Sequence, residues 1–404
     1  MSREAYWIWL QKGVGIGNNT ARVLCEIPDI EFFYNNGPDY WAATELFSPK
    51  QLDRLSAYDI NKAEEVLKLC KERNWSVITP DSELFPPQLL RIMDCPLVLY
   101  TDGDINIFDD RLAMAFVGTR SASTNGIDIT ARLSAALAKA NIVIVSGGAM
   151  GIDSAAHKGA LAVNGKTALV LGCGLACDYL KTNRKLRTEI AEKGVIITEY
   201  PPDSPARPEN FLVRNRIISA LSMGITVMEP GEKSGSLNTA AHAFRQGRKV
   251  FVVPGNILDS NQTGLKKLID SGAIMAFSPT DFVAPFLEEY EDVIDIENLS
   301  NNILKPVLDP LDVPSKLNRT SHISSTSAQY AVAEEVADTT NKIDTSQLDE
   351  NEVKVVEALK DGIKATDSLI EITGFILPQL SPLLLRLQLL GIISKTTDNK
   401  FKLK

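Results

Sequence analysis

The sequence predicts a doubly wound α/β core between residues 112 and 285, and three patterns carry that prediction. Seven short apolar runs, rich in Val and Ile, alternate there with amphipathic helical stretches. Each run ends in a turn that contains Gly, Ser, Asn or Pro, and most turns lead into a helix. Continuous apolar runs separated by helices are typical of a mostly parallel sheet covered on both faces. The runs are AMAFVG (113–118), IVIVSG (142–147), TALVLG (167–172), VIIT (195–198), ITVME (225–229), KVFVVPG (249–255) and AIMAF (273–277).

The segments on either side of this core have other patterns. Residues 1–80 have apolar residues three and four apart, as in WIWLQ and TARVLCEI, which predicts a small all-α domain. Residues 81–111 are a connector punctuated by prolines. Residues 286–348 are acidic and rich in Ser and Thr, which predicts a disordered linker. Residues 349–404 read as three short helices and a hairpin, the order of a winged-helix domain.

The net charge of −9 conceals a change of sign along the chain. Residues 1–110 carry 10 Lys and Arg against 18 Asp and Glu, and residues 283–404 carry 12 against 20, so each segment has a balance of −8. Residues 111–282 carry 20 against 13, a balance of +7. The basic segment coincides with the predicted sheet, which favours a polyanionic partner there.

The opening residues MSREAYWIWL lack the pattern of a secretory signal, and charges interrupt every apolar run before it could span a bilayer. We therefore expect a cytoplasmic protein without membrane contact. The five cysteines are scattered among apolar neighbours, as is usual for reduced thiols. The closest pair, Cys173 and Cys177, has no histidine at finger-like spacing, so no metal site is expected.

The turns after the expected strands hold the candidate binding residues. Glycine allows tight turns whose backbone N–H groups face a ligand, and a following helix favours an anion at its start. Cations occupy several of the same turns, and converging arginine side chains suit a chain of phosphates better than a single nucleotide. These cations are Arg120, Lys181, Arg214, Arg216 and Lys233.

Catalytic and cofactor motifs do not emerge from these turns. VGTRSAST is not a GxGxxG turn, no P-loop spacing occurs, and no cofactor is expected. Asp153 and Glu199 lie near the turns without a recognised pairing, and His157 follows Asp153 by one helical turn. The sequence therefore predicts a binding protein and no enzyme. A nucleotide or ribosyl-phosphate hydrolase with Asp153 or Glu199 as general base is the alternative.

Seven turn motifs together resemble those of the DprA/Smf (DNA processing protein A) family, in the same order, over residues 112–256. They are VGTR, SGGAMGIDSAAH, the GxGL…Y…N turn, TEYPP, FxxRNRIISALS, SGSLNTA and VFVVPGN. GVGIGNNTA (13–21) is similar to the helix-hairpin-helix turn of the family's N-terminal, SAM-like domain. Ala176, Leu180 and Leu212 depart from the family pattern, which uses Asp, Pro and Pro at these positions.

The resemblance implies a Rossmann-like core that binds single-stranded DNA, protects incoming DNA, and loads the RecA recombinase in natural transformation and recombination. It also implies a homodimer formed through the Rossmann-like domain. The DNA-binding residues that it implies, in addition to the cations above, are Gly118, Gly147, Gly151, Asn183, Asn215, Ser234, Gly235 and Ser236.

The C-terminal segment offers a third hypothesis, a sequence-specific regulator that reads DNA through the winged helix. Its candidate recognition helix, LSPLLLRLQLL, has only Arg386 and Gln388 as long polar side chains. A helix that reads the major groove needs several polar side chains on one face. This helix is therefore expected to be buried or to bind protein.

Overall fold

The computed structural model divides into two units, Met1–Asn318 and Arg319–Lys404, which are described separately. The first unit is described for residues 1–179, 181–232, 234–255, 264–290, 292–299 and 307. The second is described for residues 350–360, 362–375, 380, 383, 384, 387, 392–396 and 400–403. Among these residues, no helix combines the length and apolarity needed to cross a bilayer.

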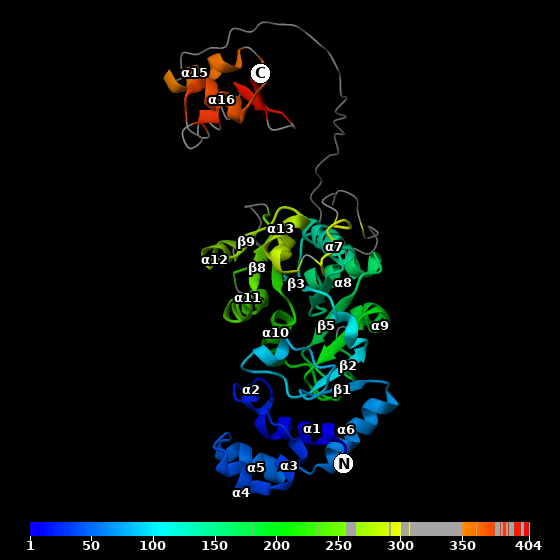
Figure 1. Ribbon diagram of the computed structural model, residues 1–404. Helices are drawn as coiled ribbons and strands as arrows, with labels where there is room; N and C mark the ends of the chain where they lie inside the picture. Colours follow the sequence, from blue (N-terminus) through cyan, green and yellow to red (C-terminus); the bar gives the residue numbers. More distant parts are fainter. Residues whose placement is uncertain are drawn as a thin grey trace. The chain divides into compact units, whose positions relative to one another are not determined.

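The first unit begins with helices and continues as alternating strands and helices (Figure 1). The helices are α1 (Arg3–Val14), α2 (Ala21–Leu24), α3 (Ile30–Asn35), α4 (Gly37–Ala43), α5 (Pro49–Ala57), α6 (Asn61–Glu72), α7 (Thr124–Lys139), α8 (Ile152–Ala162), α9 (Arg184–Lys193), α10 (Pro208–Ala220), α11 (Gly235–Arg245), α12 (Leu265–Asp270), α13 (Pro279–Val283) and α14 (Leu287–Tyr290). The strands are β1 (Ser76–Ile78), β2 (Leu99–Gly103), β3 (Ala113–Gly118), β4 (Val143–Ser146), β5 (Thr167–Leu171), β6 (Val195–Thr198), β7 (Gly224–Met228), β8 (Lys249–Val252) and β9 (Ile274–Met275).

The strands of the described first unit form one mixed, mostly parallel sheet in the order β1-β2-β6-β5-β4-β3-β7-β8-β9. Strands β3 to β9 are parallel to one another and coincide with the seven runs expected from the sequence. Strands β1 and β2 were not expected; they come from the end of the N-terminal segment and from the connector, and they extend the sheet antiparallel beyond β6. The strand order reverses between β3 and β7, which is where ligands bind in sheets of this kind.

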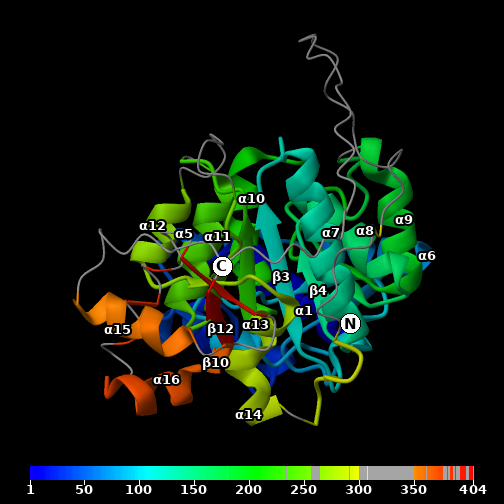
Figure 2. The same ribbon diagram turned by 90° about the horizontal axis from the view of Figure 1, so that it is seen from above.

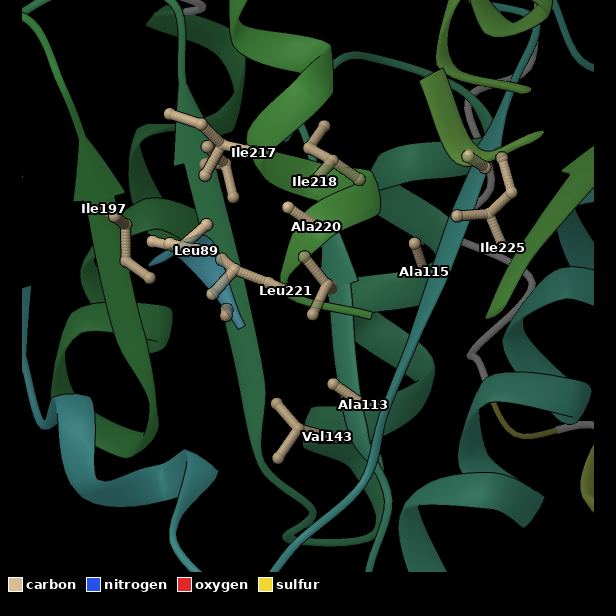
Figure 3. Close-up of a cluster of buried hydrophobic side chains, with 14 of the residues drawn as sticks. Leu89, Ala113, Ala115, Val143, Ile197, Ile217, Ile218, Ala220, Leu221 and Ile225 are labelled. Atoms are coloured by element: carbon tan, nitrogen blue, oxygen red, sulfur yellow. The ribbon is translucent and has the colours of Figure 1, made fainter. Parts of the chain in front are cut away.

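Helices cover both faces of the sheet, as Figures 1 and 2 show for α10 and α11 on one side and α7 and α8 on the other. Alternating residues of each strand face opposite helices because side chains of a strand point to alternate faces. Ala113 and Ala115 of β3 face Ile217 and Ile218 of α10 (Figure 3). Met114 and Phe116 belong instead to the core beneath α7 and α8. This packing fixes α10 against the sheet beside the reversal of strand order.

The N-terminal helices pack around α1, which is buried on almost every side. Trp7 and Trp9 are fully buried, and the Trp9 indole N–H donates to the carbonyl oxygen of Leu55 at 2.9 Å. Gln11 donates through Nε2 to the carbonyl oxygen of Glu199, at the end of β6, at 3.3 Å. The same apolar core joins α1 to Leu169 of β5 and to α9. The N-terminal helices and the sheet are therefore packed as one body.

The segment after α13 also packs against the sheet, and this packing continues beyond residue 285, where the sequence predicts that the core domain ends. Phe286 and Ile294 are buried in the core beneath α7, and the backbone N–H of Asp295 donates to the carbonyl oxygen of Ala140 at 3.2 Å. The acidic residues of 286–299 predict a linker, although most of its apolar residues pack in or against the core. Most of the expected linker after residue 299 lies outside the described residues.

The second unit contains α15 (Glu350–Leu359), β10 (Lys364–Ala365), α16 (Thr366–Thr373), β11 (Ile393–Lys395) and β12 (Lys400–Leu403). The three strands pair antiparallel in the order β10-β12-β11. Leu380, Leu384 and Leu387 of the candidate recognition helix are buried in the core of this unit. Arg386 and Gln388 lie outside the described residues.

Candidate functional site

A pocket of about 680 Å³ opens where the strand order reverses. Its walls come from the turns after β3 and β7, the first half of α10 and the start of α11, with further residues from the segments after β4 and β5. Seven of the thirteen binding residues expected from the sequence line it: Gly118, Arg120, Arg214, Asn215, Ser234, Gly235 and Ser236. The sheet topology therefore gathers residues that lie more than a hundred positions apart in the chain.

Arg120 and Arg214 are the cations that line this pocket among the described residues. Arg120 is exposed in the turn after β3, and no carboxylate of the described residues is within ion-pair distance of it. Arg214 lies deeper, with 5% of its surface exposed. Burial lowers the pKa of Arg214 from its usual value, the nearby Asp153 carboxylate opposes this effect, and the charge of Arg120 adds to it. An anion entering the pocket would thus meet an accessible cation first and a buried one behind it.

Glycines of the second turn make room for Arg214 and for close contact with the first turn. The Arg214 guanidinium donates through Nη1 to the carbonyl oxygens of Gly147, at 3.1 Å, and Val170. A Cβ at residue 147 would lie 2.6 Å from Nη1. Gly151 has a φ of 83°, and a Cβ there would lie 2.5 Å from the carbonyl oxygen of Thr119. Neither glycine lines the pocket, but both shape it.

Asn215 connects α10 to the start of α11. Its side-chain oxygen accepts from Nε of Arg214 at 3.2 Å, and its amide nitrogen donates to Asn238 Oδ1 at 3.2 Å. Ser234 caps α11 by accepting from the backbone N–H of Ser236 at 3.3 Å. Gly235 is exposed at this helix start, where the helix dipole favours an anion. The start of α11 therefore forms a second polar wall of the pocket.

Two aromatic rings form a further wall of the pocket. The rings of Tyr179 and Phe211 lie with their centroids 4.7 Å apart and their planes at 36°. The Arg214 guanidinium lies 5.7 Å from the centre of the Phe211 ring, within cation–π distance. Exposed Leu212 follows on the same wall. A flat, apolar surface beside cations suits a nucleobase attached to a phosphate.

Arg216 does not join this pocket, which corrects the expectation of a direct phosphate contact. It lies on the other side of α10, with 1% of its surface exposed. Its Nη2 donates to both carboxylate oxygens of Glu199, at 2.9 and 2.7 Å, and its Nε lies 3.2 Å from Asp94 Oδ2. Residues two positions apart in a helix point in nearly opposite directions. Arg214 of the RNR motif therefore faces the pocket, and Arg216 faces Glu199 on the other side of α10. Arg216 can position Arg214 but cannot reach a ligand in the pocket.

The carboxylates around the pocket are occupied by the protein itself. Asp153 lines the pocket and accepts the backbone N–H of Ala149 at 3.3 Å, and burial raises its pKa. Glu229 accepts the backbone N–H of Ser123, at 2.8 Å, and the Ser123 hydroxyl at the start of α7. A phosphate at either helix start would meet a carboxylate already in place. Within the described part of the chain, anion binding therefore has to come from the arginines and from the start of α11.

Glu199, the second general base considered from the sequence, lies away from the pocket. Burial raises its pKa and the adjacent Arg216 opposes this effect. Only Asp153 of the two carboxylates is placed where a ligand in the pocket could touch it. No group of three His, Cys, Asp or Glu side chains in the described part of the chain is arranged to hold a metal ion.

The third turn contributes less than the sequence suggests. Asn183 donates through Nδ2 to Ser154 Oγ at 2.7 Å and to the carbonyl oxygen of Gly148 at 3.1 Å. It therefore links the third turn to the second and does not line the main pocket. Lys181 begins the 3₁₀ turn Lys181–Asn183, but its side chain is outside the described part. Lys233 also lies outside the described residues.

Several lining residues were not singled out from the sequence. Thr119 lies inside the VGTR motif and Thr239 one turn along α11, so both could have been found by their place beside predicted residues. Ala206 comes from the long loop before α10, and Pro208 is the first residue of that helix. No residue pattern marks that loop, because its position depends on how α10 packs against the sheet.

Comparison with known proteins places this fold and pocket in a family. A sequence profile described as DNA recombination-mediator protein A matches residues 76–286, slightly more than half of the chain. Protein Smf of Synechocystis is 29% identical over 411 residues, which cover 99% of both proteins. The DNA processing protein DprA of Bacillus subtilis is 36% identical over 220 residues, 54% of this chain and 74% of that protein.

A solved structure agrees with these sequence matches. The X-ray structure of DNA processing protein A from Streptococcus pneumoniae superposes with a TM-score of 0.62 and 31% sequence identity. The superposition covers 70% of this chain and 98% of that one. The matched residues include the whole sheet from β1 to β9 and the pocket at its reversal point. The chain belongs to the DprA/Smf family, the DNA recombination-mediator protein A family.

Proposed function

We propose that this protein binds single-stranded DNA in the pocket between β3 and β7. One observation supports this proposal above all. Arg120, Arg214 and the Tyr179–Phe211 aromatic pair line the same open pocket. Phosphates would contact the arginines and the start of α11, and bases would stack on the aromatic wall. Flexible single strands can present both groups at once, whereas paired bases of a duplex are stacked inside the helix.

Titration of the full-length protein with a fluorescent oligothymidylate at two salt concentrations tests this proposal. Affinity should fall as salt rises, because each phosphate neutralised releases counterions. Arg120→Glu should weaken binding and flatten the salt dependence. Lys139→Glu is the matched control, because Lys139 is exposed at the far end of α7 and the charge change is the same. Equal binding by the Arg120 variant and the wild type would refute the proposal.

The further role that we propose is protection of incoming DNA and delivery of the strand to RecA during transformation and recombination. It is supported by family membership and by the relatives called DNA processing protein. Bound strand should resist a single-strand nuclease, and RecA filaments should nucleate faster on strands carrying this protein. RecA assembly at the same rate on bare and coated strands would refute the delivery role, while leaving strand binding in place.

We also propose that the Rossmann-like domain forms a homodimer through its β9 edge. Among the described residues β9 ends the sheet; Met275 within it and Phe277 just after it are 48% and 71% exposed. An uncovered edge strand with apolar side chains favours pairing with another chain. Sedimentation of the wild type and of Phe277→Glu tests this: the variant should sediment as a monomer. Identical sedimentation of the two proteins would contradict the proposed interface.

We propose that residues 1–80 form a helix-hairpin-helix domain, that residues 349–404 form a winged helix, and that the protein acts in the cytoplasm.

We further propose that the pocket binds without catalysis, because Asp153 is held by backbone N–H groups and Glu199 lies outside the pocket. Incubation with nucleotides tests this: turnover that Asp153→Asn abolishes would establish the hydrolase alternative.

A further inference from the structure

Two cysteines from distant parts of the chain meet at the boundary between the N-terminal helices and the sheet. Cys25 follows the last residue of α2, and Cys95 lies in the connector before β2. Their sulfur atoms are 3.1 Å apart, although 70 positions separate them in sequence. A disulfide needs a sulfur separation of about 2.05 Å. The two sulfurs therefore need to approach by only about 1 Å to bond.

The backbones around these cysteines are already held together. The backbone N–H of Arg22 donates to the carbonyl oxygen of Met93 at 3.2 Å. The Arg22 guanidinium donates through Nη1 to the carbonyl oxygen of Arg91 at 3.3 Å. Helix α2 is thus docked on the connector whether or not the sulfurs are bonded. Bond formation would lock an existing contact without rearranging the fold.

The two thiols differ in access to solvent. Cys25 is half-buried and Cys95 is 1% exposed. The contact with Cys25 and burial both raise the pKa of Cys95 above its usual value. A small reagent from solution can therefore reach Cys25, while Cys95 stays a protonated thiol behind it. This arrangement separates an attacking thiol from a resolving thiol.

We propose that Cys25 and Cys95 form a modification site for low-molecular-weight disulfides of the glutathione class. The Cys25 thiolate attacks one sulfur of the small disulfide, forms a mixed disulfide and releases one small thiolate. Cys95 then loses its proton and attacks the sulfur of Cys25. The second small thiol leaves, and a Cys25–Cys95 bond remains. Two protein thiols are oxidised and one small disulfide is reduced to two thiols, so electrons and protons balance.

The bond would connect the N-terminal helices to the residues behind the pocket. Cys95 directly follows Asp94, whose carboxylate lies 3.2 Å from Nε of Arg216 on α10. Arg214, two residues earlier on the same helix, lines the pocket. A closed bond would hold α2, the connector and this ion pair at fixed spacing. Cys25 and Cys95 do not line the pocket, and their oxidation does not depend on strand binding.

Peptide mapping of the full-length native protein after equilibration in glutathione buffers tests the proposal. The wild type should give a linked peptide pair containing Cys25 and Cys95. Cys173 and Cys177 are a second neighbouring pair, and Cys177 lines another pocket. The measurement is therefore repeated in Cys173→Ser/Cys177→Ser, in which the Cys25–Cys95 link should form unchanged.

Single variants distinguish the two steps. Cys95→Ser should retain glutathione on Cys25, because the resolving thiol is missing. Cys25→Ser should take no glutathione on Cys95, because that thiol is buried. If Cys25 and Cys95 stay reduced under conditions that modify Cys177, the proposal is overturned. A link that forms only after unfolding in urea would overturn it as well.

Discussion

The guanidinium of Arg214 occupies the space that a side chain at Gly147 would need. Its Nη1 donates to the Gly147 carbonyl oxygen at 3.1 Å, and a Cβ on residue 147 would lie 2.6 Å from the same atom. The glycine of the second turn and the arginine of α10 thus depend on each other, although 67 positions separate them. Gly147 acts on the pocket through the position of a cation.

Gly147→Ala should therefore weaken strand binding with little change in fold. The added methyl group pushes the Arg214 guanidinium away from the carbonyl oxygens that hold it, and one charge-assisted contact with phosphate is lost. About a tenfold loss of affinity for an oligothymidylate is expected, measured by fluorescence titration. Gly231→Ala is the matched control, because a Cβ at that pocket position meets no atom within 4 Å. Equal losses in both variants would contradict this account.

Arg216→Met should destabilise the whole protein. Its removal leaves the carboxylates of Glu199 and Asp94 near each other, and Glu199 is 2% exposed. Breaking a buried pair by removing one partner costs about 3–5 kcal/mol in free energy of unfolding. Urea denaturation measures the loss, and adding Glu199→Gln should recover part of it. Lys266→Met, which breaks the exposed pair with Asp270, should cost less than about 1 kcal/mol.

His157 should make the protein less stable in mild acid. Thr167 Oγ1 donates to the carbonyl oxygen of Ile144, so it accepts from Nδ1–H of His157 at 2.7 Å and fixes the neutral tautomer. Burial first, and then Arg214, lower the pKa of His157 to about 3. Between pH 6.5 and 3 the unfolded histidine binds a proton that the folded one does not, so stability falls as pH falls through this window.

The variant His157→Gln isolates this effect because glutamine does not titrate. The difference in unfolding free energy between wild type and variant should change by up to about 1.4 kcal/mol per pH unit below pH 6.5. Above pH 7 the difference should be constant. Denaturation curves at several pH values provide the measurement, and parallel pH profiles of the two proteins would show that His157 is protonated in the folded state.

Phe211→Leu should reduce binding of bases more than binding of phosphates. The variant removes the ring that lies 4.7 Å from Tyr179 and 5.7 Å from the Arg214 guanidinium. Loss of stacking should cost about 1–3 kcal/mol per stacked base. Affinity for oligothymidylate should therefore fall, while affinity for an abasic strand of equal length should hold. Leu212→Ala, at the neighbouring exposed position, should affect both strands equally.

The sequence predicts the parallel part of the sheet because each of these strands, and the turn that follows it, is recognisable from a few consecutive residues. Strands β3 to β9 are continuous apolar runs, and the turns after β3 and β7 each carry glycine, serine and a basic residue within a few positions. Strand β2 is not predicted, because only its pairing with β1 and β6 makes Leu99–Gly103 a strand. The sequence predicts Arg216 in the pocket because it belongs to the same motif as Arg214 and carries the same charge. Only the packing of α10 shows that the two side chains lie on different sides of the helix.

Pairing of β2 with β6 has a practical consequence for anyone who shortens this chain. A fragment that began after Gly103 would remove the neighbour of β6 and uncover backbone donors and acceptors from Val195 to Thr198. It would also strip the apolar helices from Leu169 and Ile196. Unpaired strand edges next to exposed apolar surface promote aggregation. An expression fragment meant to stay monodisperse should therefore retain everything from Arg3 onward.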